Sequence, residues 1–247
     1  MRKMRLVAVA MLAVLGLSAV AYAQTNEYSF DGKVPSGGTK SKPKTGGFTF
    51  NFQIKDPAGN VPSVVKTYKF VIAGSKVNTS AVKATCTAAK INAAGTDDSC
   101  PAAAIVGSGS IRAEIGTSSQ PWDGTTKCDL VLTAYNGGPN KVALYLDGTN
   151  TAKCVAPISQ ALDAKWSNGA AGAGLSFDVP DELRHQLGLD VAVVDVKSTW
   201  KKLTGKKGSK KIGYFETTGC KGKRSASVTF TTEDGTANPT TGTVGAC

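Results

Sequence analysis

Histidine and glutamate are scarce in this sequence, which limits the catalytic sites that it could form. The one histidine is His185. A Ser-His-Asp or Cys-His site would have to use it, but no G-x-S-x-G motif accompanies it, so we interpret it as an ordinary surface residue. Glu216 follows Tyr214 and Phe215 on a predicted strand, where a catalytic acid could lie. Because it is the only acid in a lysine-rich segment, we expect it to form an ion pair.

Motifs for metal ions, phosphate and cofactors are also missing. The sequence has no C-x-x-C pair, and a single histidine does not complete a typical zinc site. Gly107-Ser108-Gly109 is not followed by the Gly-Lys of a phosphate-binding loop. We expect it to continue as a strand, with a bulge or a close backbone approach at the glycines. We therefore predict no cofactor and no metal.

Long apolar runs are confined to the N-terminus. Basic residues within 1–5 precede the apolar run 6–20 and the small-x-small exit Ala21-Tyr22-Ala23. This order predicts a secretory signal peptide, residues 1–23, cleaved before Gln24. An uncleaved anchor is the rival interpretation, but the run is barely long enough to span a bilayer. The mature chain, 24–247, is then secreted or located at the cell surface, with no transmembrane segment.

The cysteines all lie in the mature chain. An even number of cysteines in an exported protein indicates that all of them form disulfides. Six cysteines allow 15 pairings, among which the sequence alone does not choose. Their spacing favours local loops, and a loop of about 15 residues stabilises by about 3 kcal/mol. The predicted pairs are Cys86–Cys100, Cys128–Cys154 and Cys220–Cys247.

Alternating apolar and polar side chains recur along the mature chain, as is typical of antiparallel sheets with one solvated face. The clearest run is 48–55, which places three phenylalanines and Ile54 on one side. Turn signals such as 136–140 separate the runs. We predict a mainly β fold: an antiparallel, immunoglobulin-like β-sandwich of about ten to twelve strands, with one short helix at 181–187 and three disulfides.

The domain organisation follows from the same pattern. We predict a single domain over 24–247, and two sandwiches dividing near 120–126 are the alternative. Two segments rich in glycine, serine and lysine, 32–47 and 203–211, are predicted to be flexible loops.

Positive charge is concentrated in one segment. The formal net charge of +11 becomes +8 without the three basic residues of the signal peptide. Ten basic residues and one acid lie between Lys197 and Arg224, so this segment carries +9 and the rest is about neutral. A dense positive patch attracts polyanions through its field and through counterion release. The predicted polyanion-binding residues are Lys201, Lys202, Lys206, Lys207, Lys210, Lys211, Lys221, Lys223 and Arg224.

These lysines have a second explanation, since lysines on an edge hairpin prevent sheets from aggregating and keep a loop solvated. The excess of lysine over arginine favours diffuse attraction over specific recognition. The expected partner is an anionic cell-envelope polymer or polysaccharide, not a specific nucleic acid. We therefore predict a non-catalytic secreted or cell-envelope-associated structural or binding module. A secreted carbohydrate-active enzyme with paired carboxylates is the alternative.

Several short elements carry a resemblance. They are C-T-A-A-K from Cys86, S-C-P-A-A-A-I-V-G-S-G-S at 99–110, L-S-F-D-V-P at 175–180 and K-I-G-Y-F-E-T-T-G-C-K at 211–221. Together with Cys247, they are similar to elements of a group of exported bacterial β-sandwich proteins to which no activity is assigned. The resemblance implies an exported β protein and adds no chemistry.

Overall fold

The computed structural model describes residues 26–247, so the predicted signal peptide and its cleavage site lie outside the described residues. Most strands belong to one twelve-stranded antiparallel sheet, in which β11 pairs only with β12. In sheet order its strands are β1 (Glu27–Lys33), β3 (Phe48–Lys55), β12 (Leu189–Trp200), β6 (Ile105–Gly116), β7 (Lys127–Gly138), β8 (Lys141–Asp147), β9 (Ser159–Gly169), β10 (Gly172–Asp178), β4 (Val65–Ala73), β16 (Lys223–Thr232) and β17 (Ala237–Ala246), with β11 (His185–Gln186) beside β12.

The smaller elements lie around this sheet. A three-stranded sheet has the order β2 (Lys44–Thr45), β15 (Phe215–Thr217) and β5 (Ser75–Val77), and a two-stranded sheet joins β13 (Thr204–Lys207) to β14 (Lys210–Gly213). The helices are α1 (Ala88–Ala94), α2 (Asp181–Arg184) and the 3-10 turns η1 (Thr79–Ala81) and η2 (Ala102–Ala104).

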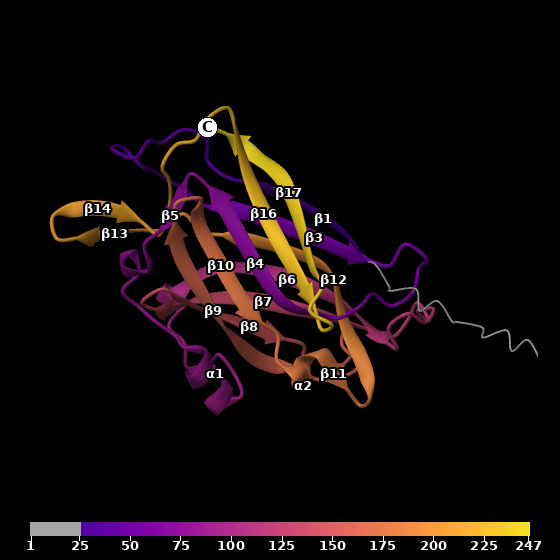
Figure 1. Ribbon diagram of the computed structural model, residues 1–247. Helices are drawn as coiled ribbons and strands as arrows, with labels where there is room; N and C mark the ends of the chain where they lie inside the picture. Colours follow the sequence, from indigo (N-terminus) through magenta and orange to yellow (C-terminus); the bar gives the residue numbers. More distant parts are fainter. Residues whose placement is uncertain (1–25) are drawn as a thin grey trace, which may run out of the picture.

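The large sheet folds over on itself and nearly closes. Its two edge strands, β1 and β17, lie side by side (Figure 1), and the Val34 amide donates to the Val244 carbonyl at 2.8 Å. The result is the predicted antiparallel sandwich with a continuous hydrogen-bonded ladder. An immunoglobulin domain divides its strands between two separate sheets, so this ladder does not show an immunoglobulin-like topology. Strands from both sides of 120–126 share the sheet, since β4 lies between β10 and β16.

Two kinds of side chain form the core because inward positions of a strand recur every second residue. Strands β3, β4 and β16 contribute aromatic rings, such as Phe52, Tyr68 and Phe230, whose centroids lie 5.3–5.7 Å apart. Strands β7, β8 and β9 contribute leucines, such as Leu132 and Leu144, which are also buried. A ring-rich layer therefore faces a leucine-rich layer.

The disulfides connect the cysteines as predicted. Cys86 pairs with Cys100, Cys128 with Cys154 and Cys220 with Cys247. None of the six cysteines is free. The predicted local loops are confirmed. Within the described residues, no helix combines the length and the apolar character needed to cross a bilayer.

The helices differ from the prediction in number and in length. α2 ends at Arg184, and the following residues form a tight hairpin between β11 and β12. Leu187 and Gly188 have φ values of 53° and 78°, as both central residues of such a turn require. Gly188 therefore serves the turn and not a helix C-cap. α1 is a second helix, which the Thr87 side chain caps by accepting a hydrogen bond from the Lys90 amide at 3.2 Å.

The two segments predicted to be flexible loops contain strands. The segment 32–47 includes β2, which pairs with β15. The segment 203–211 includes β13 and the start of β14, which form a hairpin of their own. Each is held by pairing that sequence composition does not reveal.

Candidate functional site

The β13–β14 hairpin projects from the body of the sandwich (Figure 1) and carries a cluster of lysines. The register places Lys206 opposite Lys211 and Lys207 opposite Lys210. All four side chains are exposed. Like charges directly opposite one another on paired strands destabilise the pairing. The opposed lysines therefore repel one another, and no acidic side chain within the hairpin offsets this repulsion.

The base of the hairpin is fixed to the body. Ile212 is buried, and the Tyr214 amide donates to the Leu203 carbonyl at 2.9 Å. A Cβ at Gly205 would lie 2.1 Å from the Ala81 carbonyl oxygen, so only glycine permits the strand to approach η1 this closely. The lysines are thus held away from the body on an anchored stem.

A second basic segment lies at the same end of the molecule. Pairing of β2 with β15 places Lys44 opposite Thr217, whose hydroxyl donates to the Gly37 carbonyl at 2.8 Å. This brings Lys40, Lys42 and Lys44, all exposed, beside the segment 217–224. Sequence reasoning missed these three because a long stretch of chain separates them from the hairpin.

We define the basic end as the exposed lysines that these pairings gather. It comprises Lys40, Lys42, Lys44, Lys201, Lys202, Lys206, Lys207, Lys210, Lys211, Lys221 and Lys223. Within the part of the chain that the structure describes, none of these lysines forms an ion pair.

Arg224 does not belong to this surface, although the sequence grouped it with the lysines. Its side chain is buried, at 0% exposure, and donates to the Ala73 and Gly74 carbonyls at 2.6 and 2.5 Å. Burial lowers its pKa. Arg224 shares the inward face of β16 with Ala226 and Val228, so the two-residue period of the strand was the signal that could have shown its burial.

Glu216 forms the ion pair that the sequence predicted. Its Oε2 lies 3.1 Å from the Lys76 Nζ and accepts a hydrogen bond from the Asn78 side chain at 3.2 Å. Its Oε1 accepts from the Gly213 amide at 2.8 Å. The carboxylate is buried and ties β5, β14 and β15 together beneath the basic end.

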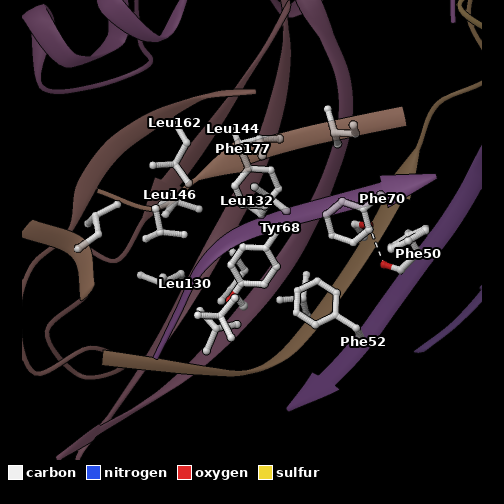
Figure 2. Close-up of a pocket in the computed structure, with 18 of the residues that line it drawn as sticks. Phe50, Phe52, Tyr68, Phe70, Leu130, Leu132, Leu144, Leu146, Leu162 and Phe177 are labelled. Carbon is white, nitrogen blue, oxygen red and sulfur yellow. Dashed lines mark hydrogen bonds between the residues drawn. The ribbon is translucent and has the colours of Figure 1, made fainter. Parts of the chain in front are cut away.

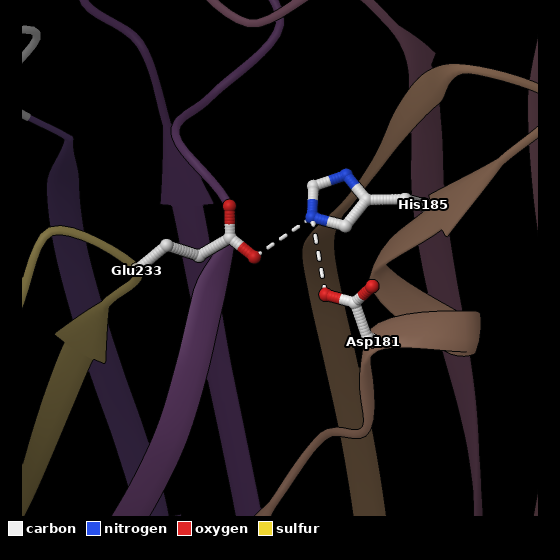
Figure 3. Close-up of side chains that lie close together, drawn as sticks. All are labelled: Asp181, His185 and Glu233. Atoms are coloured by element: carbon white, nitrogen blue, oxygen red, sulfur yellow. Dashed lines mark hydrogen bonds and ion pairs between the residues drawn. The ribbon is translucent and has the colours of Figure 1, made fainter.

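Charges at the opposite end of β16 are paired. The His185 Nδ1 lies 3.0 Å from an Asp190 oxygen, and its Nε2 lies 2.8 Å from a Glu233 oxygen and 3.8 Å from an Asp181 oxygen (Figure 3). Arg184, which is buried, contacts both Asp181 and Glu233. His185 is thus part of a network and not an isolated surface residue. We call this network, with α2, the acidic end.

The acidic end has the donor set of a metal site. Ligand atoms of Asp181, His185 and Glu233 all lie within 4.8 Å of one another, so these residues could hold a metal ion. Arg184, however, contacts the same Glu233 oxygen, and its guanidinium would repel a dication at that distance. The arrangement fits an ion-pair network that ties α2 to the β16–β17 turn better than it fits a metal site.

The pKa of Asp190 follows from this network. Burial raises the pKa of the carboxyl group, but hydrogen bonds from Ser118 and His185 outweigh it and leave the pKa below its ordinary value. The Ser118 amide lies 2.9 Å from the Asp190 oxygen. Asp190 is therefore held in its ionised form, where it orients the imidazole.

Paired carboxylates occur in a groove of about 500 Å³ beside β9 and β10. Asp163 and Asp178 both line it, and both are exposed. Each has a partner, since Asp163 lies 3.0 Å from the Lys141 Nζ and Asp178 accepts a hydrogen bond from the Thr67 hydroxyl at 2.5 Å. No tryptophan lines this groove. Trp166 and Trp200 are buried in the core, and Trp122 is half-buried.

The interior of the sandwich contains an apolar cavity of about 110 Å³ between the two layers (Figure 2). Leu130, Leu132 and Leu144 line it from one layer, and Phe52 and Phe70 line it from the other. Leu183 and Arg184 of α2 also line it, so the cavity reaches the acidic end. No sequence signal pointed to this space.

Comparisons of the chain with protein-family models, with curated proteins and with solved structures found no match. The resemblance to exported bacterial proteins therefore stays a prediction, and functional conclusions depend on the geometry of the chain itself.

Proposed function

We propose that this chain is an exported, non-catalytic binding protein whose basic end binds an anionic polymer of the cell envelope. The observation that supports this most directly is the pairing of Lys206 with Lys211 and of Lys207 with Lys210 across a projecting hairpin. A bound polyanion would remove the repulsion within these pairs and release its own counterions.

The alternative explanation of the lysines, protection of a sheet edge, is less well supported. Edge lysines prevent the open edge of a sheet from pairing with another molecule. Here the edges of the large sheet, β1 and β17, lie against one another, and the hairpin forms a separate two-stranded sheet. Four lysines on that hairpin do not guard the edges that would most need them.

The chemistry of the surface favours polymer over small ligand. Lysine ammonium groups are compact, hydrated charges that attract anions without fixing their orientation. The basic end spreads such groups over the hairpin, the segment 40–44 and the loop that contains Lys221 and Lys223. A polymer with repeated negative charges can contact several of these places at once, which raises its affinity through effective concentration.

The test is retention on immobilised heparin and on immobilised polygalacturonate. The variant with Lys206, Lys207, Lys210 and Lys211 changed to Ala should elute at much lower salt than the wild type. A matched control changes Lys66, Lys69, Lys153 and Lys165, which are exposed elsewhere, to Ala. Equal shifts for both variants would mean that only net charge matters and would refute the proposal.

Export is part of the same proposal. Three disulfides support it, because such bonds persist in oxidising compartments. We expect material isolated from the medium or the envelope of an expressing bacterium to begin at Gln24. A sequence that begins at residue 1 would contradict cleavage, and free thiols throughout native material would contradict export.

The second candidate function is a carbohydrate-active enzyme, and the groove that contains Asp163 and Asp178 favours it. Glycoside hydrolysis uses two carboxylates that flank the scissile bond. This candidate predicts that the protein releases reducing ends from a polysaccharide and that Asp163→Asn abolishes the release. If the wild type releases no reducing ends from a panel of envelope polysaccharides, the enzymatic candidate is refuted and only the proposed binding function remains.

A further inference from the structure

We infer that the cavity inside the sandwich is a binding site for a small, neutral, mainly apolar molecule that carries one hydrogen-bonding group, which Tyr68 recognises.

The size of the cavity suits such a molecule. A closed sheet of about eight strands encloses a space that side chains can fill, and the enclosed space grows with strand number. Here eleven strands follow one another along the ladder from β1 to β17, and about 110 Å³ stays open between the layers. An engineered apolar cavity of about 150 Å³ stays dry and binds benzene. The space here is smaller than that cavity, so the largest ligand that it suits is a single small ring.

Tyr68 supplies the polar feature of the cavity. It lies between the leucines and the phenylalanines of the lining (Figure 2), and its side chain is 2% exposed. Burial raises its pKa, so the hydroxyl stays protonated and can donate. Among residues 26–247, no group hydrogen-bonds to this hydroxyl. A hydroxyl that opens onto an apolar space without a protein partner has little hydrogen bonding, and a ligand that accepts its proton would supply it.

The other described tyrosines show how unusual this is. Tyr214 accepts from the Trp166 indole at 3.0 Å, and Tyr135 donates to Asp97 at 2.5 Å. Tyr145 and Tyr28 have hydroxyl or amide partners at 2.8 and 3.1 Å. Each of these four has a partner within the protein, which leaves Tyr68 as the exception within the described chain.

The remaining polar side chains of the lining indicate a neutral ligand. The Ser198 hydroxyl donates to the Phe50 carbonyl at 2.7 Å, and the Arg184 Nε donates to the Val179 carbonyl at 2.9 Å. Arg184 is also paired with Glu233 and Asp181. No charge is left free to neutralise an ionic ligand. Leu183 and Arg184 of α2 also line the cavity.

The test compares phenol and toluene, which have nearly the same shape, by calorimetry on the wild type and on Tyr68→Phe. Both ligands should bind the wild type. The preference for phenol over toluene should fall by about fivefold in Tyr68→Phe, the factor that corresponds to a hydrogen bond of about 1 kcal/mol. Tyr145→Phe, which removes a hydroxyl outside the cavity, should leave the preference unchanged. An unchanged preference in Tyr68→Phe, or no binding of either ligand up to its solubility limit, would overturn the inference.

A second pair of variants tests the cavity itself. Leu132→Phe adds volume inward, whereas Val131→Phe adds an even larger volume on the outer face of β7, where Val131 is 57% exposed. Leu132→Phe should keep the thermal stability of the free protein and lose toluene binding, and Val131→Phe should keep both. If Leu132→Phe lowers the melting temperature as an overpacked core does, and toluene does not bind the wild type, the space is ordinary core and the inference fails.

Discussion

The two ends of the sandwich hold their charges in different ways. β16 connects them, from Lys223 at the basic end to Thr232, next to Glu233 at the acidic end. At the acidic end Arg184, His185 and their carboxylates contact one another, whereas at the basic end the hairpin lysines face only other lysines. Paired charges hold the fold in one arrangement. Unpaired charges of one sign repel one another and lower the stability of the fold. We infer that the lysines of the basic end serve to bind a partner.

Arg224 allows the sharpest test of this comparison, because it is a basic residue next to the basic end that is buried and hydrogen-bonded to the Ala73 and Gly74 carbonyls. We expect Arg224→Ala to lower the free energy of unfolding by about 3 kcal/mol or more, from the lost charged hydrogen bonds and the cavity left behind. Chemical denaturation measures this. Substitution of Lys206 by Ala, the matched surface control, should change it by less than about 0.5 kcal/mol. Equal effects would remove the distinction between the buried, hydrogen-bonded charge of Arg224 and the exposed charges of the lysines.

Glu233 provides the corresponding test at the acidic end. Glu233→Gln keeps the shape and removes the charge that faces Arg184, which is buried. Asp181 still contacts Arg184, but it is largely exposed. We therefore expect a loss of about 1 kcal/mol, well below that of breaking a fully buried pair. Thermal unfolding at pH 7 measures the loss, and a variant as stable as the wild type would show that the network does not hold α2.

Asp190 makes the acidic end sensitive to pH. Its pKa is lower in the folded protein than its ordinary value, so the unfolded chain binds the proton more readily. Its contribution to stability is therefore complete above the unfolded pKa, about 3.9, and is lost as the pH falls through the lower folded value. Asp190→Asn should be less stable than the wild type at pH 7, and the difference should shrink below about pH 4. A difference that is constant from pH 7 to pH 3 would contradict this.

The smallest effect is expected at the hairpin. Lys211→Glu converts the opposed pair with Lys206 into one of opposite charge. Such a change on paired strands should raise stability by about 0.5 kcal/mol, and added salt should diminish the gain. The same variant should bind heparin less tightly than the wild type. A gain in stability together with weaker heparin binding would support the contrast between the two ends. A variant that is less stable and also binds less tightly would contradict it.

The sequence predicted some features of the sites and not others, for physical reasons. Strand alternation and cysteine spacing are local along the chain, so the sandwich and the disulfide pairs could be predicted. Lys44 and Thr217 become neighbours only through β2 and β15, and His185 meets Glu233 only across the folded sheet. Such contacts depend on strand order, which no local pattern contains. Arg224 is a different case. The two-residue period of β16 indicated that its side chain faces inward, but the many lysines nearby in the sequence led us to group it with them.

The cavity could not have been predicted from the sequence. The residues that line it, such as Leu130, Leu132, Phe50 and Phe52, also fit ordinary core positions. Whether side chains fill the space between two layers depends on how far the sheet closes and on the volumes that meet across it. Tyr68 likewise became notable only when its surroundings offered its hydroxyl no partner.

The central claim, that the unpaired lysines of the basic end bind an anionic polymer, is tested most directly by the salt dependence of heparin affinity. We predict a linear fall of log affinity with log salt concentration in the wild type. Because each contacted anion releases counterions, the slope should decrease by about 3 when Lys206, Lys207, Lys210 and Lys211 are changed to Ala. A slope that is the same in the wild type and in this variant would contradict the account.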